Sequence, residues 1–81
     1  METQPDNKAL MQEAVRNWIA AAQTHPRGAA LLREKVRVIE TYMRDLGHPH
    51  TPIPSHLEGL TAFDLANAHS ALFAASMKVP A

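Results

Sequence analysis

The chain contains no cysteine, which excludes a disulfide framework and a cysteine-ligated zinc site. Aromatic residues make up only 5% of its 81 residues, and much of its 46% hydrophobic content is alanine. Large core side chains are therefore few, and a domain this small often gains burial from a partner. We predict one α-helical domain over residues 1–81, with a flexible N-terminus at 1–5, that associates as a homodimer.

Long hydrophobic runs and a net charge are also missing. No stretch approaches the ~18 uninterrupted apolar residues of a membrane span, and the N-terminus has no apolar signal core. Eight basic residues balance eight acidic ones, so no overall field draws the chain to nucleic acid or to an anionic membrane. We therefore expect a cytoplasmic protein that does not associate with membranes.

Familiar catalytic patterns are absent from the sequence. It has no Gly-x-Ser-x-Gly elbow, no glycine-rich nucleotide-binding pattern and no His-Glu-x-x-His. Ser55 and Ser70 each have a histidine as neighbour, but adjacency in sequence does not supply the hydrogen-bonded geometry of a triad. We predict a protein that is not an enzyme and binds no cofactor.

Apolar residues recur at helical spacing along the chain, and no segment alternates as a strand would. This pattern predicts an all-α fold, a small three-helix bundle. The predicted helices cover about residues 6–24, 26–46 and 61–78, and a proline- and histidine-rich connection covers 47–60. In the first helix, Asp6 or Asn7 is the expected N-cap, with a capping box of Thr3 and Asp6 as the alternative. Trp18 is the expected core anchor.

The second predicted helix has the clearest stop signal. Pro26 suits a first helical position, Gly47 is expected to end the helix in the left-handed conformation, and Pro49 forbids continuation. Two apolar stripes together cover an arc of roughly 160°, wider than the ~100° that one neighbouring helix needs. They consist of Leu32, Val36, Ile39, Met43 and Leu46, and of Leu31, Val38 and Tyr42. This helix is expected to contact two partners.

The third predicted helix has the clearest start and also two apolar stripes. Thr61 and Asp64 form a capping box, and Leu60 with Leu65 forms a hydrophobic staple. One stripe contains Leu65, Ala68, Leu72, Ala75 and Val79, and the other contains Phe63, Ala66, Phe73 and Met77. A tight monomer with closely packed alanines is one interpretation. We favour association through Phe63, Phe73 and Met77, because three short helices offer too few faces to bury both stripes.

Arg33, Arg37 and Arg44 share one face of the second predicted helix, interrupted by Glu40. A solvated face, with Glu40 pairing Arg44 at i,i+4, is the simplest interpretation of this stripe. The function we favour is a non-catalytic protein–protein interaction module: a regulator, adaptor or inhibitor that masks a site on another protein. The apolar contact would come from the second stripe of the third helix, with the arginines as a rim. The alternative is a dimeric nucleic-acid-binding transcriptional regulator that uses the arginines on phosphates.

The connection between the second and third helices carries three histidines: His48, His50 and His56. Imidazoles bind zinc, nickel or copper, so a metal site is a third and less favoured prediction. A proline between two ligands limits how they converge, and Glu58 is the only carboxylate nearby. We interpret the segment as a stiff connection, with a short helical turn capped by Ser55. His69 is predicted to lie at a core edge or interface.

Overall fold

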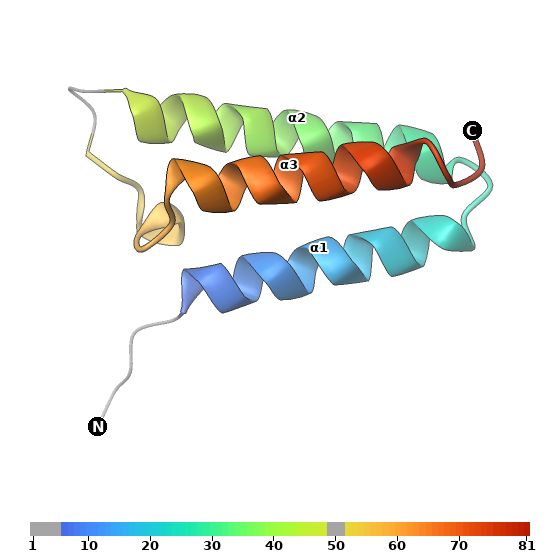
Figure 1. Cartoon of the computed structure of the whole chain (residues 1–81), viewed down its shortest axis with the longest axis horizontal. Coiled ribbons are helices and arrows are strands. Elements are labelled where there is room, and N and C mark those ends of the chain that lie inside the picture. The colour runs from blue at the N-terminus through green and yellow to red at the C-terminus, as the bar shows by residue number, and fades with distance from the viewer. Residues whose placement is uncertain (1–5, 49–51) are drawn as a thin grey trace.

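A computed structural model describes residues 6–48 and 52–81 (Figure 1). The helices are α1 (Asn7–Gln23), α2 (Gly28–Gly47) and α3 (Ala62–Ser76), with the 3₁₀ turn η1 (Ser55–Leu57) before α3. The predicted all-α, three-helix bundle is confirmed, and no strand occurs in the described ranges. The predicted flexible segment 1–5 lies outside these ranges. No helix within them combines the length and hydrophobicity needed to cross a bilayer.

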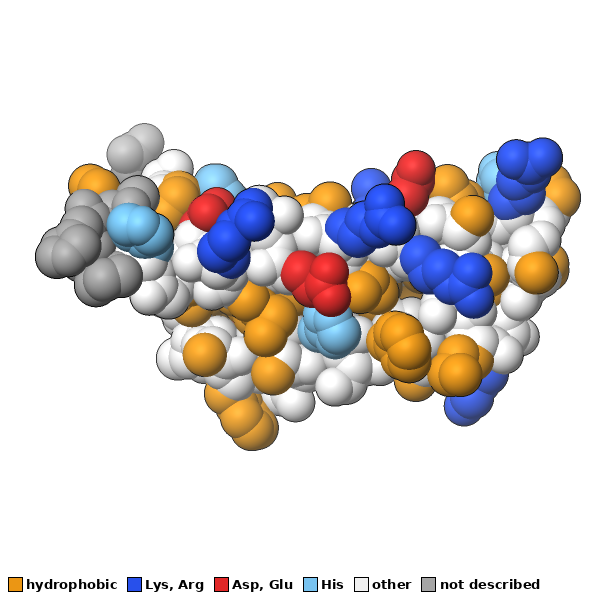
Figure 2. Space-filling model, turned by 90° about the horizontal axis from the view of Figure 1, so that it is seen from above, with side chains coloured by type: hydrophobic (Ala, Val, Ile, Leu, Met, Phe, Trp, Pro, Cys, Tyr) orange, Lys and Arg blue, Asp and Glu red, His pale blue; other side chains and the backbone are white. Residues whose placement is uncertain are grey.

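The core lies between the three helices, and η1 contributes to it at one end. Of the three helix pairs, α2 and α3 make the most extensive contact. Seen from above, basic side chains follow the length of the molecule beside a row of hydrophobic side chains (Figure 2). The buried apolar residues are Val15, Ala22, Ala29, Leu32, Val36, Ile39, Leu57, Leu60, Leu65, Ala68 and Leu72. The first apolar stripes of α2 and α3 therefore supply most of the core.

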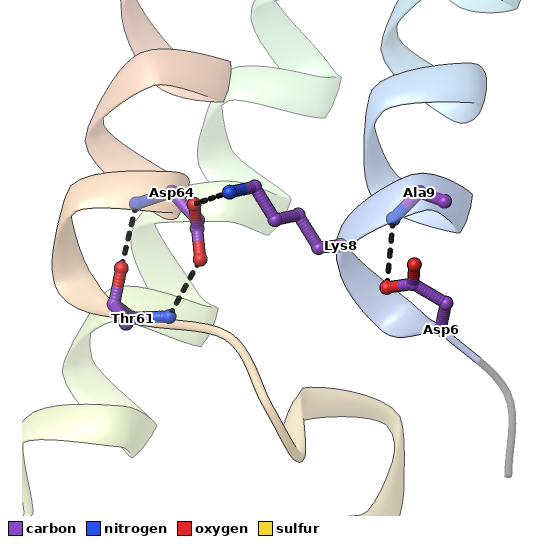
Figure 3. Close-up of polar contacts among 5 residues, drawn as sticks. All are labelled: Asp6, Lys8, Ala9, Thr61 and Asp64. Atoms are coloured by element: carbon purple, nitrogen blue, oxygen red, sulfur yellow. Dashed lines mark hydrogen bonds and ion pairs between the residues drawn. The ribbon is translucent and has the colours of Figure 1, made fainter.

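The start of α1 matches its predicted cap. The Asp6 carboxylate accepts a hydrogen bond from the backbone N–H of Ala9 at 3.3 Å (Figure 3). The Asn7 amide donates to the carbonyls of Ser55 at 3.0 Å and Glu58 at 2.8 Å, which ties this end of α1 to η1. Trp18 is only partly buried and packs against the edge of the core.

The edge position of Trp18 follows from how α1 meets its neighbours. The fully packed residues of α1 are the smaller Val15 and Ala22. The indole lies beside α2, where Lys35 Nζ is 5.0 Å from the ring centre. The expected core anchor is therefore a boundary residue that covers the side of the core.

The predicted start of α2 at residue 26 is wrong, because Pro26 lies in the turn and the helix begins at Gly28. Arg27 provides no side-chain cap. Two backbone carbonyls accept from the first N–H groups of the helix in place of a side-chain cap. The Gly28 N–H donates to the His25 carbonyl at 3.1 Å, and the Ala29 N–H donates to the Pro80 carbonyl at 2.7 Å. A Cβ on Gly28 would overlap the Ala22 carbonyl, so only glycine permits this close approach of α2 to α1.

The predicted left-handed cap at Gly47 is also wrong. Gly47 is the last residue of α2, and the chain leaves the helix through His48 in an extended conformation, with φ −80° and ψ 117°. A residue before proline avoids the helical region, and Pro49 follows His48 in the sequence. This restriction ends α2 without a left-handed residue. The described glycine with positive φ is Gly59, at 82°, just after η1.

The connection to α3 contains the predicted short turn, η1, although Ser55 does not cap it. The predicted capping box of α3 is confirmed (Figure 3). Thr61 Oγ1 accepts from the backbone N–H of Asp64 at 3.1 Å, and the Asp64 carboxylate accepts from the Thr61 N–H at 3.0 Å. Leu60 and Leu65, the predicted staple, are both buried. The backbone N–H of Thr61 lowers the pKa of Asp64 below its ordinary value.

Candidate protein-docking site

The exposed side of α2 and α3 brings the predicted basic and apolar residues onto one surface, which we call the α2–α3 face. The two helices are joined there by Glu40 and His69, whose Oε2 and Nε2 atoms lie 3.1 Å apart. Figure 2 shows the basic row beside the hydrophobic row on this side of the molecule. The face consists of Arg33, Arg37, Glu40 and Arg44 from α2, of Phe63, His69 and Phe73 from α3, and of Met77, the C-cap of α3. At about 100° per residue, Phe63 lies roughly 80° round α3 from Phe73, so it borders the face on the side away from α2.

The apolar part of the face lies in solvent. Phe63 and Met77 are each 73% exposed, and Phe73 is 51% exposed. Phe73 and Met77 are one turn apart, whereas Phe63 lies roughly 15 Å further toward the start of α3 at 1.5 Å per residue. These side chains do not contribute to the core of the single chain. Their role as a protein contact stays a prediction, and their exposure leaves them available for it.

The basic part of the face runs along α2. Arg33, Arg37 and Arg44 are all exposed, and none of them forms an ion pair with a described carboxylate. The expected pair between Glu40 and Arg44 is not formed, because Glu40 contacts His69 on α3 instead. The arginine charges are therefore not compensated within the described part of the chain.

His69 lies where the basic and apolar parts meet. Its side chain is 29% exposed, and Glu40, its partner across the helix pair, is 57% exposed. The His69 ring is stacked with the Phe73 ring, with centroids 6.4 Å apart and planes 5° apart. This position agrees with the predicted edge histidine. It also holds the Phe73 ring beside the α2–α3 contact.

Two of the three histidines of the connection, His48 and His56, lie in the part of the chain that the structure describes. Within residues 6–48 and 52–81, no group of three or more His, Asp or Glu is placed to hold a metal ion. The His56 ring packs against Tyr42, with centroids 5.1 Å apart and planes at 57°, so it secures η1 to α2. His50 lies outside the described residues, and the metal hypothesis for His48, His50 and His56 stays a prediction.

A second surface feature, a hollow between α1 and α3, was not predicted from the sequence. Its volume is about 230 Å³, and the small side chains of Ala68 and Ala71 leave this space. Met11, Val15 and Leu60 form its other apolar walls. The Lys8 ammonium reaches across from α1 to the Asp64 carboxylate, 3.8 Å away (Figure 3). The run of alanines in α3 was the only signal for it in the sequence.

Comparison with known proteins identifies no relative of this chain. No protein-family model matches it, and neither the curated proteins nor the solved structures contain a match. The surface of the molecule is therefore the basis for a functional proposal. The α2–α3 face is the surface on which exposed aromatic side chains and uncompensated arginines lie together.

Proposed function

We propose that this protein is a non-catalytic interaction module, a regulator, adaptor or inhibitor, that binds another protein through the α2–α3 face and masks a site on it. The observation that supports this most strongly is the exposure of Phe63, Phe73 and Met77 on one helix. Large exposed apolar side chains rimmed by polar residues mark protein contacts. Arg33, Arg37 and Arg44 provide such a rim along α2.

The exposed apolar area sets the strength of the expected association. A phenylalanine buries roughly 150–250 Å², so the exposed shares of Phe63, Phe73 and Met77 sum to roughly 400 Å². A standard interface buries about 800 Å² per partner. The apolar residues would therefore supply about half of such an interface. The arginines lie beside them to extend the contact and to raise specificity and the association rate.

Loss of partner binding on disruption of the face is the test. Phe73→Ser with Met77→Ser removes the apolar contact, and Leu10→Ser is the matched control because Leu10 is 53% exposed on α1. The tagged chain and both variants are expressed in the native cells, and retained proteins are compared after thermal melts verify folding. A protein retained by the wild type and the control but lost with the double variant supports the proposal. Equal retention by all three contradicts it.

Self-association into a homodimer is a further proposal. A net charge of zero at neutral pH does not keep copies of the chain apart. Sedimentation velocity at increasing protein concentration measures it directly. A constant monomer mass up to millimolar concentration would exclude the homodimer but would leave binding to another protein untouched.

A dimeric nucleic-acid-binding regulator is the second candidate, and the uncompensated arginines favour it. Phosphate contacts made by Arg33, Arg37 and Arg44 would show a steep dependence of affinity on salt. Changing all three to glutamate would abolish such binding. The candidate is rejected if the wild type retains no DNA or RNA at low salt.

A further inference from the structure

We propose that the partner of the α2–α3 face is an acidic amphipathic helix, which lies along α2 and α3 and completes a four-helix bundle. This inference rests on the proposed function, since it identifies the chemistry of the partner at the same surface. It follows from the shape of the face, from the arrangement of its apolar and basic rows, and from the contact that Glu40 makes within it.

The shape of the face suits a helix. α2 and α3 run side by side in opposite directions (Figure 1), and the Ala29 N–H bonds the Pro80 carbonyl just beyond α3. α2 and α3 each contact α1 and one another, and the exposed α2–α3 face can take a fourth helix that packs against both. The apolar row from Phe63 to Met77 extends over roughly 21 Å of α3. A helix of about four turns covers this length, with apolar residues every three or four positions.

The position of the arginine row beside the apolar row determines which charge the partner helix should carry. Arg33, Arg37 and Arg44 lie on α2 beside the apolar row on α3, and they extend over roughly 16 Å. A helix that covers the apolar row therefore places one flank against these guanidinium groups. Carboxylates on that flank would form charge-assisted, bidentate pairs with them, whereas lysines would be repelled.

Glu40 offsets only part of this positive charge and forms no ion pair with the arginines. It lies within the arginine row, but its carboxylate is directed to His69 at 3.1 Å. The two side chains connect α2 to α3 at the middle of the face. The arginines on either side of Glu40 thus keep their hydrogen-bond donors for a partner.

The same charges favour an acidic partner on this face over the second copy of the chain that a homodimer would place there. In a two-fold interface, residue i contacts residue j and j contacts i. If the axis crosses both rows, the arginine row of one copy faces that of the other. If the axis runs along the apolar row, the two arginine rows lie on opposite flanks and gain no acidic partner from this face. Three arginines against one engaged glutamate give each row an excess of positive charge. Nucleic acid is favoured less, because phosphate contacts would leave Phe63, Phe73 and Met77 in water.

Two synthetic helical peptides test the inference with the full chain. Both are about five turns long and have the same leucine seam, but one carries glutamates along the flank and the other carries lysines. Fluorescence anisotropy measures their binding at low and high salt. We expect the acidic peptide to bind at least about tenfold more tightly than the basic one, a difference that decreases as salt screens the pairs.

Charge reversal on the protein is the decisive variant. Arg33→Glu with Arg37→Glu should reverse the preference, so that the basic peptide binds better. Arg16→Glu is the matched control, because Arg16 is exposed on α1 and borders the hollow between α1 and α3. It should leave the preference unchanged. Phe73→Ser with Met77→Ser should weaken both peptides, since they share the leucine seam.

Several results would overturn the inference. Equal binding of the two peptides, or an equal effect of Arg16→Glu and the double reversal, removes the charge argument. If neither peptide binds while Phe73→Ser and Met77→Ser still abolish retention of a native protein, the acidic helix is wrong and the proposed function stands. If those serine changes abolish only a homodimer, the occupant is a second copy. Salt-sensitive DNA binding that displaces the acidic peptide identifies nucleic acid instead.

Discussion

Replacing Gly28 with alanine tests the tightest contact between α1 and α2. A Cβ at this position would overlap the carbonyl oxygen of Ala22 and lie 2.9 Å from the Ala22 carbonyl carbon. Both are backbone atoms at the end of α1, so no side-chain rotation relieves the overlap. The two helices would have to separate at the turn between them.

The expected change is a loss of stability. Helix propensity alone favours alanine over glycine by up to ~1 kcal/mol. Forcing an extra methyl group into a packed position costs typically ~1–3 kcal/mol, and here rigid backbone lies against it. We therefore expect Gly28→Ala to lower the free energy of unfolding by roughly 1–2 kcal/mol. The midpoint temperature should fall by about 4–15 °C for a domain of this size.

Gly47→Ala provides the matched control, because Gly47 also lies in α2 but a Cβ there would meet nothing within 4 Å. Its φ is not positive, so alanine should raise stability by up to ~1 kcal/mol. Urea and thermal unfolding followed by far-ultraviolet circular dichroism measure both variants. The reasoning is refuted if Gly28→Ala is as stable as the wild type. A loss with Gly47→Ala would indicate a left-handed cap after all.

Three further predictions concern the core and the start of α3. Leu72 is fully buried, so Leu72→Ala should cost ~2–5 kcal/mol, a large part of the roughly 4–12 kcal/mol expected for a chain of this length. Chemical denaturation measures the loss in the free energy of unfolding. A loss below ~1 kcal/mol would contradict the prediction, because buried Leu→Ala changes typically cost ~2–5 kcal/mol. Thr61→Ala removes one half of the capping box and should lower the free energy of unfolding by about 1 kcal/mol. Urea denaturation measures this change, and an unaltered urea midpoint would contradict the prediction. The pKa of Asp64 is lowered from its ordinary 3.8, so its contribution to stability is complete above that pH and is lost as the pH falls through the lower, folded value. Asp64→Asn should therefore be less stable than wild type at neutral pH and should show a flatter acid dependence of unfolding, whereas parallel pH profiles would contradict this assignment.

Local signals in the sequence were sufficient for the helices and for two of their starts. Asp6 caps α1, and Thr61 with Asp64 caps α3, because each cap needs only residues three positions apart. The start of α2 could not be predicted in this way. It depends on the Pro80 carbonyl and on the approach of Gly28 to Ala22, and neither contact is visible in a local pattern.

The candidate site was likewise predicted in part from local sequence patterns. Helical periodicity placed Arg33, Arg37 and Arg44 on one side of α2 and assigned Phe73 and Met77 to a stripe separate from Leu72. Periodicity alone does not determine which stripe is buried, since that depends on where α2 lies against α3. The choice of Phe63, Phe73 and Met77 as the outward stripe came from the small number of helix faces available for burial.

The partner of Glu40 shows the limit most directly. Local spacing favours Arg44, four residues away, whereas the folded chain provides His69, 29 residues away. The sequence by itself determined which side chains share a helical face, because backbone geometry repeats every 3.6 residues. Only the packing of helices distant in sequence decided what each face meets, and hence which charges and apolar side chains are left for a partner.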